Sequence, residues 1–191
     1  MTEPRIAVLG AGANGASIGA DLIRAGRDVT LIEQWPAHVE RMRSDGLTVQ
    51  TPEETIRVEP EVIHLCEVAE SRRPFDVVLM LMKAYDARWA AQLLEPHLAA
   101  DGLMAGVQNG MTARVVEEIV GAHRTVATVI ECSATMEEPA LVHRHTPVSR
   151  SWFATGTLPG GPPRSARRRS RRCCGIRAPS IISTTSRAPN G

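Results

Sequence analysis

Apolar runs alternate with longer amphipathic stretches along the first 110 residues of the chain. Residues 5–9 (RIAVL) and 77–82 (VVLMLM) are almost entirely apolar, which is typical of strands that are buried on both faces of a parallel sheet. Residues 28–33 and 102–107 are also rich in apolar residues and are expected to be strands of the same kind. The alternation predicts parallel strands connected by crossover helices.

Between these strands, apolar residues recur at the three- and four-residue spacing of amphipathic helices. We expect helices at residues 14–25, 36–45, 85–98 and 112–120, and further strands at residues 124–130, 141–145 and 151–154. Residues 47–65 are rich in β-branched side chains but contain two prolines, so short strands or a hairpin are expected there. The predicted fold class is α/β, a Rossmann-type doubly wound and mostly parallel sheet.

Charge is distributed very unevenly along the 191 residues. Residues 1–157 carry all 21 acidic residues and 14 of the 22 basic ones, whereas residues 158–191 carry eight Arg and no acidic residue. Only four of those last 34 residues are Leu, Ile, Val or Phe, which is too few to build a core. We therefore expect one folded domain at residues 1–157 and a disordered Arg-rich tail at residues 158–191.

Two explanations compete for this tail. The arginines between residues 164 and 172 could neutralise nucleic-acid phosphates, but no aromatic side chain lies among them to stack on bases. A frameshift near residues 156–161 of a GC-rich gene would also produce Arg, Pro, Ser, Gly and Ala. We favour the frameshift, because the tail begins where a folded domain should continue, and we expect no nucleic-acid partner.

Membrane and disulfide-rich classes are disfavoured. The longest apolar run, residues 77–82, is far shorter than the roughly 20 residues of a membrane-spanning helix, and the N-terminus lacks a secretory signal pattern. The four cysteines include no C-x-x-C pair, so neither a disulfide framework nor a zinc knuckle is supported. We expect a cytoplasmic protein with reduced thiols and no membrane partner.

A glycine-rich loop follows the first predicted strand and opens the first predicted helix. Its sequence, GAGANG at residues 10–15, fits G-x-G-x-x-G in the context that a dinucleotide site requires. Gly10 would allow a sharp turn, Gly12 would leave room for a pyrophosphate, and Gly15 would let the helix lie close to the strand. The predicted cofactor-binding residues here are Gly10, Ala11, Gly12, Ala13, Asn14 and Gly15; the alternative is a loop of the same shape without a ligand.

Glu33 ends the second predicted strand, 21 residues after Gly12. A carboxylate at this point can accept hydrogen bonds from the adenosine ribose hydroxyls and repels a 2′-phosphate. Glu33 therefore favours NAD over NADP, although Arg41 or Arg43 on the next helix could still reach a phosphate. The alternative is a solvated strand end.

Two polar residues follow later strands, and ligands of doubly wound sheets bind at the carboxyl ends of the strands. Lys83 is the only lysine in a chain with 21 arginines, and its ammonium could contact the cofactor; a surface charge is the alternative. Asn109, in the sequence QNGM, carries an amide that could hold a carboxylate or hydroxyl, but Asn-Gly is also a common turn pair.

Together these motifs resemble the N-terminal domain of the ketopantoate reductase (2-dehydropantoate 2-reductase) family. The resemblance rests on residues 6–15 (IAVLGAGANG), the strand that leads to Lys83, and residues 108–111 (QNGM). It implies an oxidoreductase that uses NADPH to reduce the 2-oxo acid 2-dehydropantoate to (R)-pantoate, on the route to pantothenate and coenzyme A. It also implies that Lys83 lies near the cofactor and that Asn109 contacts both cofactor and substrate.

The chain departs from this family in two ways. After the second strand, many members have a basic residue that binds the 2′-phosphate, whereas this chain has Glu33-Gln34-Trp35. In this respect it is similar to NAD-linked 2-hydroxy-acid dehydrogenases of the D-mandelate type. The family's helical C-terminal domain, with its catalytic lysine, has no counterpart after Ala154. We therefore assign no catalytic residue and expect a truncated chain with little activity. A non-catalytic module that binds a nicotinamide dinucleotide is the alternative, and a homodimer is left open.

Two other candidate sites are given structural interpretations. His143 and His145 could share one face of a strand, but no carboxylate or thiol lies at ligand spacing, so exposed histidines are favoured over a metal pair. Cys132 follows an apolar strand and is expected to be a buried small hydrophobic residue rather than a nucleophile. No metal is predicted.

Overall fold

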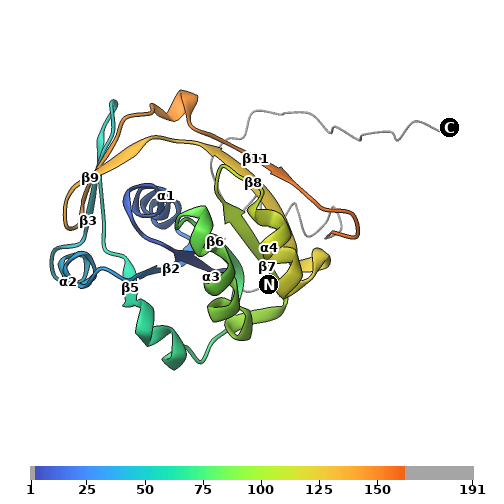
Figure 1. Ribbon diagram of the computed structural model, residues 1–191. Coiled ribbons are helices and arrows are strands. Elements are labelled where there is room, and N and C mark those ends of the chain that lie inside the picture. Colours follow the sequence, from blue (N-terminus) through green and yellow to red (C-terminus); the bar gives the residue numbers. More distant parts are fainter. Residues whose placement is uncertain (1–2, 162–191) are drawn as a thin grey trace.

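The centre of the molecule is a seven-stranded sheet in the order β11-β8-β7-β6-β1-β2-β5 (Figure 1). The structure, a computed structural model, describes residues 3–161. The strands are β1 (Arg5–Leu9), β2 (Asp28–Glu33), β5 (Glu61–His64), β6 (Phe75–Met80), β7 (Leu98–Val107), β8 (Thr125–Glu131) and β11 (Trp152–Gly156). All neighbours pair in parallel except β11, which lies antiparallel to β8.

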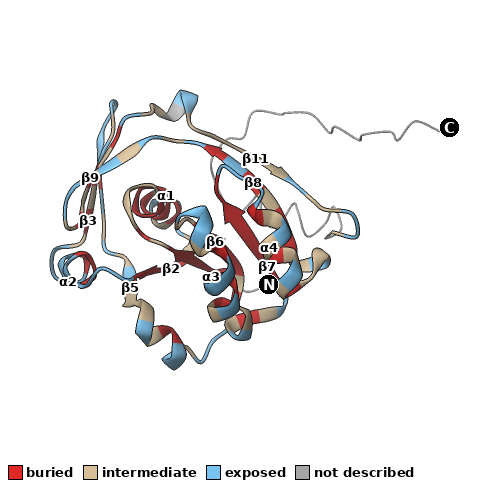
Figure 2. Cartoon of the chain, in the orientation of Figure 1, coloured by how far each residue is buried: buried red, intermediate tan, exposed pale blue. Residues whose placement is uncertain are grey.

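Helices cover both faces of this sheet, as expected of a doubly wound fold. The helices are α1 (Ala13–Arg24), α2 (Pro36–Asp45), α3 (Ala87–Leu94) and α4 (Thr112–Val120). Because side chains alternate along a strand, β1 contributes Ile6 and Val8 to a core shared with α1 and α2, and Ala7 and Leu9 to a core shared with α3 and α4. Figure 2 shows the buried strands between helices whose outer sides are exposed. The predicted fold class is confirmed.

A second, four-stranded sheet packs against α1 from the side opposite the central sheet. Its order is β4-β3-β10-β9, formed by β3 (Leu47–Gln50), β4 (Thr55–Val58), β9 (Ala134–Glu138) and β10 (Leu141–Arg144). The chain passes from β8 into β9, turns, and returns through β10 to β11, so that a ribbon arches over α1 and connects the two sheets (Figure 1). The helix that follows the glycine loop is therefore enclosed between two sheets.

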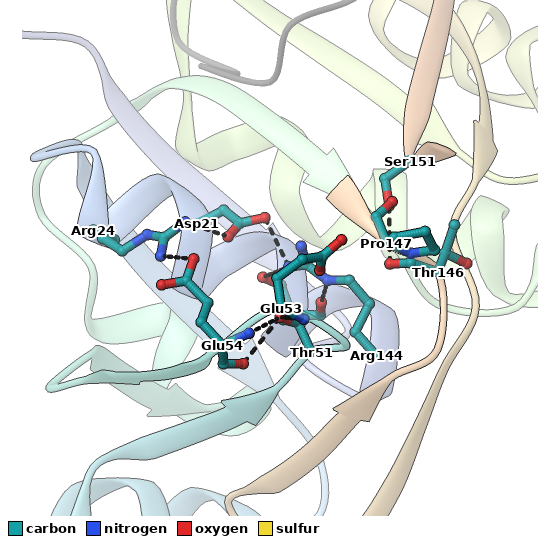
Figure 3. A network of polar contacts seen from close by, with 10 residues as sticks. Asp21, Arg24, Thr51, Glu53, Glu54, Arg144, Thr146, Pro147 and Ser151 are labelled. Atoms are coloured by element: carbon teal, nitrogen blue, oxygen red, sulfur yellow. Dashed lines mark hydrogen bonds and ion pairs between the residues drawn. The ribbon is translucent and has the colours of Figure 1, made fainter. Parts of the chain in front are cut away.

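Buried polar contacts attach this ribbon to α1. Arg144, at the end of β10, is 2% exposed; its Nε donates to Ser17 Oγ over 2.6 Å, and its guanidinium contacts Asp21 Oδ2 over 2.7 Å. Figure 3 shows Arg144 reaching Asp21, which Arg24 also approaches. A buried guanidinium needs such partners, because an unpaired buried charge is costly.

The predicted elements agree with the structure most closely where helix and strand patterns are uninterrupted. The predicted bounds of β1, β2, α2 and α4 are those observed. The strand predicted at 77–82 lies at Phe75–Met80 instead. The helix predicted at 85–98 is confined to α3, because Pro96 lacks the N–H that a continuing helix needs; the chain after it is already β7, which starts at Leu98.

Tertiary pairing changes two further assignments. Residues 47–65 contain the expected antiparallel hairpin, β3 with β4, but β5 leaves it and pairs with β2 in the central sheet. β9 was not predicted, because only its pairing with β10 makes it a strand. No helix within residues 3–161 is both long and apolar enough to cross a membrane. Apart from residues 158–161, the predicted tail lies outside the described residues.

Candidate functional site

The glycine loop between β1 and α1 makes a tight turn against two neighbouring segments. Gly10 has a φ of +86°, a conformation that side chains with a Cβ rarely adopt, and a Cβ there would lie 2.7 Å from the backbone nitrogen of Met82. The N–H groups of Gly10 and Ala11 donate to the carbonyl of Ile32 in β2, over 3.0 and 3.3 Å. The loop is therefore held at the carboxyl ends of β1, β2 and β6.

The other two glycines of the motif have different surroundings. A Cβ on Gly15 would lie 2.0 Å from the carbonyl oxygen of Gly10, so only glycine lets α1 begin this close to the strand. A Cβ on Gly12 would meet no described atom within 4 Å. The space beside Gly12 is thus open toward the outside of the loop, whereas the space beside Gly10 and Gly15 is filled by the protein's own backbone.

The first turn of α1 has the polarity of an anion site. Gly12 is the N-cap and has no side chain to accept the free N–H groups, which carry the positive end of the helix dipole. α1 is described in full, and its first turn holds no acidic residue. Asn14 Oδ1 is buried and has no hydrogen-bond partner among the described residues. These features fit a phosphate-bearing ligand that carries hydroxyl donors nearby.

Glu33 lies at the end of β2, next to this loop. Its side chain is largely buried, with the residue 8% exposed, and its Oε1 accepts the N–H groups of Gln34 and Trp35 over 2.8 and 3.1 Å. Neither bond uses Oε2, which remains for a further donor. The backbone bonds fix the direction of the carboxylate and keep it ready to accept.

The two arginines considered for a 2′-phosphate are engaged elsewhere on α2 and β5. Arg41 Nε contacts Asp45 Oδ2 over 2.9 Å. Arg43 contacts Glu40 and Glu67 and donates to the carbonyl of Val62. Arg43 is therefore held by three acceptors, whereas the exposed Arg41 is held only through its Nε by one exposed carboxylate.

Lys83 lies three residues beyond β6 rather than immediately after a strand, and it is exposed. The segment before it is fixed: Leu81 N–H donates to the carbonyl of Leu9 over 2.8 Å, and the backbone of Leu81 and Met82 fills the space that a Cβ on Gly10 would need. The structure therefore brings the start of the Lys83 segment directly against the glycine loop, although the two are about 70 residues apart in the sequence.

Asn109 lies beyond β7 and is exposed, but half of its amide is committed. Its Oδ1 accepts the N–H of Ile130 in β8 over 3.2 Å, so the Nδ2 group is the part that can bind a ligand. The preceding Gln108 donates from Nε2 to the carbonyl of Met82 over 2.8 Å. Gln108 thus connects the turn that carries Asn109 to Met82, the residue before Lys83.

His38 is a buried polar residue of this region that the sequence analysis did not single out. It is fully buried on α2. Ala140 N–H donates to its Nδ1 over 2.8 Å, and its Nε2 lies 2.9 Å from the carbonyl oxygen of Ala11. Burial lowers the pKa of His38, while the bond to Ala11 and the charge of Glu33 oppose this effect. Its spacing from Met42, four residues along the same helix, was the available signal that it faces the core.

The other side chains weighed in the sequence lie in structural settings. The rings of His143 and His145 lie tilted at 34° to each other with their centroids 4.7 Å apart, and His145 Nε2 is 2.6 Å from Thr135 Oγ1. Cys132 packs against the core of the central sheet, and burial raises the pKa of its thiol, which disfavours a reactive thiolate. Within residues 3–161, no group of three or more His, Cys, Asp or Glu residues could hold a metal ion.

The chain is similar to proteins of one known family. The family model described as "Ketopantoate reductase PanE/ApbA" matches residues 6–156. A 2-dehydropantoate 2-reductase from Halobacterium salinarum is 34% identical over 144 residues, which are 74% of this chain and 46% of that protein. One from Nostoc sp. is also 34% identical, over 62% of this chain and 35% of that protein. The chain thus spans less than half the length of these curated relatives.

Solved structures share the fold. A PanE/ApbA family ketopantoate reductase from Ralstonia eutropha superposes with a TM-score of 0.74 and 26% identity, covering 90% of this chain and 54% of that one. D-mandelate dehydrogenase in a ternary structure with NADH and anilino(oxo)acetate gives a TM-score of 0.79 at 21% identity, covering 92% of this chain and 56% of that one. At this identity the second likeness concerns the fold alone.

Proposed function

Because the chain belongs to the ketopantoate reductase PanE/ApbA family, we propose that it binds a nicotinamide dinucleotide and derives from an enzyme that reduces 2-dehydropantoate to (R)-pantoate. Its family members and structural neighbours are oxidoreductases. A bound reduced nicotinamide would supply the hydride in such a reaction. The residues of this chain would bind the cofactor and hold the 2-oxo acid beside it.

The observation that carries this proposal is the open space beside Gly12 at the N-terminus of α1. Gly10 and Gly15 are glycine because the protein's own backbone surrounds them, but no packing contact in the described chain requires a glycine at position 12. A pyrophosphate there would be met by the free N–H groups of the helix. The amide of Asn14, whose Oδ1 lacks a partner, would accept from a hydroxyl of the same ligand.

Glu33 supports a preference for NAD over NADP. Its Oε2 would accept hydrogen bonds from the adenosine ribose, and its charge would repel a 2′-phosphate. Arg41 and Arg43, which could have offset this repulsion, are paired with carboxylates. We therefore expect NADH to bind more tightly than NADPH.

Titration of the purified protein with NADH and NADPH by calorimetry tests this preference. The Glu33→Gln variant removes the charge but keeps an Oε1 that can accept from Gln34 and Trp35. It should narrow the difference between the two Kd values about tenfold, which corresponds to roughly 1.4 kcal/mol. Arg57→Gln on the exposed side of β4 is the matched surface control. Tighter binding of NADPH to the unaltered protein would contradict the assignment.

At the substrate end, Asn109 would contact the 2-oxo acid and the nicotinamide, and Lys83 would contact the cofactor. Asn109 Nδ2 would hold a carboxylate or carbonyl oxygen, since its Oδ1 is bound to β8. Hydride transfer to a ketone develops negative charge on oxygen, which requires a positioned cation or proton donor. Lys83 is the only lysine of the chain, and its role beside the glycine loop is closer to the cofactor. We therefore propose slow or no turnover by this chain alone.

A second candidate function is a module that binds the dinucleotide without catalysing a reaction. It is favoured because the described residues form the open, anion-favouring loop beside Gly12, whereas no proton donor for a ketone is assigned among them. An assay of NADH and NADPH oxidation separates the candidates. The substrates are 2-dehydropantoate and benzoylformate, the 2-oxo acid whose reduction gives mandelate. Binding without oxidation supports the module, oxidation with 2-dehydropantoate supports the reductase, and oxidation with benzoylformate alone supports a related 2-hydroxy-acid dehydrogenase.

A further inference from the structure

His38 connects three segments that lie far apart in the sequence. It belongs to α2, its Nε2 lies against Ala11 in the glycine loop, and its Nδ1 lies against Ala140 in the turn between β9 and β10. The side chain is fully buried, so water does not compete for either bond. A buried imidazole with both nitrogens engaged is held in a single orientation.

The two contacts define which nitrogen of His38 carries the proton. The partner of Nδ1 is a backbone N–H, which can only donate, so Nδ1 must be the unprotonated acceptor. Nε2 then carries the hydrogen and donates it to the carbonyl oxygen of Ala11 over 2.9 Å. The neutral imidazole is required, because a protonated ring would point two N–H groups at each other on the Ala140 side.

This bond orients the peptide that joins Ala11 to Gly12. The described chain contains no cis peptide bond, and in a trans peptide the C=O and N–H groups point in opposite directions. Since the Ala11 carbonyl points toward His38, the N–H of Gly12 points away from it. The N–H of Ala11 is also fixed, because it donates to Ile32 in β2. Ala11 is therefore anchored on both sides, and the orientation of the next N–H follows.

We propose that His38 is a positioning residue for dinucleotide binding: it holds the Gly12 N–H in the direction from which a pyrophosphate is bound. This inference rests on the proposed function, and it goes beyond it because the buried His38 would act through the Ala11 carbonyl rather than on the ligand. It also couples the loop to the ribbon that connects the two sheets, through the turn at Ala140. That turn is itself constrained, since Ala140 has a φ of 63°.

Two substitutions separate the two bonds of His38. An Asn amide reaches as far from the backbone as Nδ1, so His38→Asn can keep the acceptor for Ala140 but loses the donor to Ala11. A Gln amide reaches as far as Nε2, so His38→Gln can keep the donor to Ala11 but loses the acceptor for Ala140. Each variant loses one buried hydrogen bond, so their losses of stability should be similar.

Calorimetric titration with NADH and NADPH then distinguishes positioning from stability. We expect His38→Asn to raise the Kd of the tighter nucleotide about tenfold, and His38→Gln to restore it to within about threefold of the unaltered protein. The neighbouring buried Val39 supplies the control: Val39→Ala should lower Tm while leaving Kd unchanged. Equal Kd values for the Asn and Gln variants, or Kd values that follow Tm across all three variants, would overturn the inference.

A measurement without nucleotide keeps the two proposals distinguishable. The ¹⁵N shifts of His38 should identify the Nε2–H form, and the amide signal of Gly12 should move in His38→Asn far more than in His38→Gln. An unchanged Gly12 signal in His38→Asn overturns the inference alone. Failure of the unaltered protein to bind either nucleotide contradicts the proposed function and the inference together.

Discussion

At the residue scale, one loop uses three glycines for three different physical reasons. Gly10 has a positive φ and lies too close to the backbone of Met82 for a Cβ. Gly15 lies too close to the carbonyl oxygen of Gly10 for a Cβ, whereas the space beside Gly12 is open. The sequence motif does not distinguish the three glycines, but a methyl group added to each of them would have different surroundings. The difference separates residues that shape the loop from the residue that faces a ligand.

A pair of alanine substitutions tests this separation. Gly15→Ala would place its Cβ 2.0 Å from the Gly10 carbonyl oxygen, and the free energy of unfolding should fall by about 3 kcal/mol. Gly12→Ala meets no described atom and should change stability by less than about 1 kcal/mol, yet raise the Kd for NADH at least about tenfold. Urea denaturation and calorimetry measure the two effects. Unimpaired nucleotide binding by a folded Gly12→Ala protein would remove the main support for the pyrophosphate site.

The buried neutral His38 makes stability depend on pH. Burial lowers its folded-state pKa below the 6.5 of an exposed histidine, although Ala11 and Glu33 favour the proton. The unfolded chain therefore binds the proton more readily, so stability is fully present above about pH 6.5 and is lost as the pH falls through the folded-state pKa. Urea denaturation at pH 7.5 and 5.5 should show this loss, and His38→Gln should show a smaller one. The same loss in both proteins would assign the dependence to other groups.

At the scale of elements, α1 is held between two sheets by polar as well as apolar contacts. Its apolar side faces the central sheet, where Ile18 and Leu22 are buried, and Ser17 and Asp21 face the ribbon through Arg144. The position of the helix N-terminus therefore depends on contacts made more than 120 residues later in the chain. The ribbon acts as the outer wall of the element that carries the proposed anion site.

Removing the Arg144 side-chain charge should loosen this wall. Arg144→Met leaves Ser17 Oγ and the partly exposed Asp21 carboxylate without their guanidinium, and we expect a loss of about 2–3 kcal/mol in the free energy of unfolding. Arg57→Met on the exposed side of β4 removes an arginine from the same sheet and should change it by less than about 0.5 kcal/mol. Thermal and urea denaturation of both variants provide the comparison. Equal losses would show that the buried pair contributes no more than a surface charge.

At the scale of the whole molecule, the family match runs through both sheets. It covers residues 6–156, and residue 156 is also the last residue of β11. β11, the last strand of the described residues, extends the central sheet by pairing with β8. Residues 3–161 therefore contain both sheets, all four α-helices of the described chain, and every residue of the candidate site.

We expect that residues 158–191 contribute neither to folding nor to nucleotide binding. A protein ending at residue 157 should keep its Tm within about 2 °C, since the loss would be well below 1 kcal/mol, and should bind NADH with an unchanged Kd. Differential scanning fluorimetry and calorimetry on both lengths test this. A shortened protein that fails to fold would contradict the predicted domain boundary, and one that folds without binding would give the tail a role at the site.

The sequence by itself determined the α/β fold and the order of its main elements. Hydrophobic periodicity is a local property, so β1, β2, α2 and α4 could be predicted with their bounds. The glycine motif likewise predicted a turn in which two of the three glycines have a backbone reason to be glycine. Local spacing also suggested Glu33, Lys83 and Asn109 as candidates, because each lies at or beyond the carboxyl end of a predicted strand.

Only the tertiary structure decided which of these residues are free to act and what supports them. Whether Asn109 has a free oxygen depends on Ile130, and whether Arg43 can bind a phosphate depends on Glu67. The pairing of β9 with β10 makes β9 a strand, and the pairing of β5 with β2 places β5 in the central sheet. The neutral form of His38 follows from its hydrogen bond with the N–H of Ala140, 102 residues later. Long-range hydrogen bonds and burial leave no periodic trace in the chain, since they join positions whose separation no local pattern encodes.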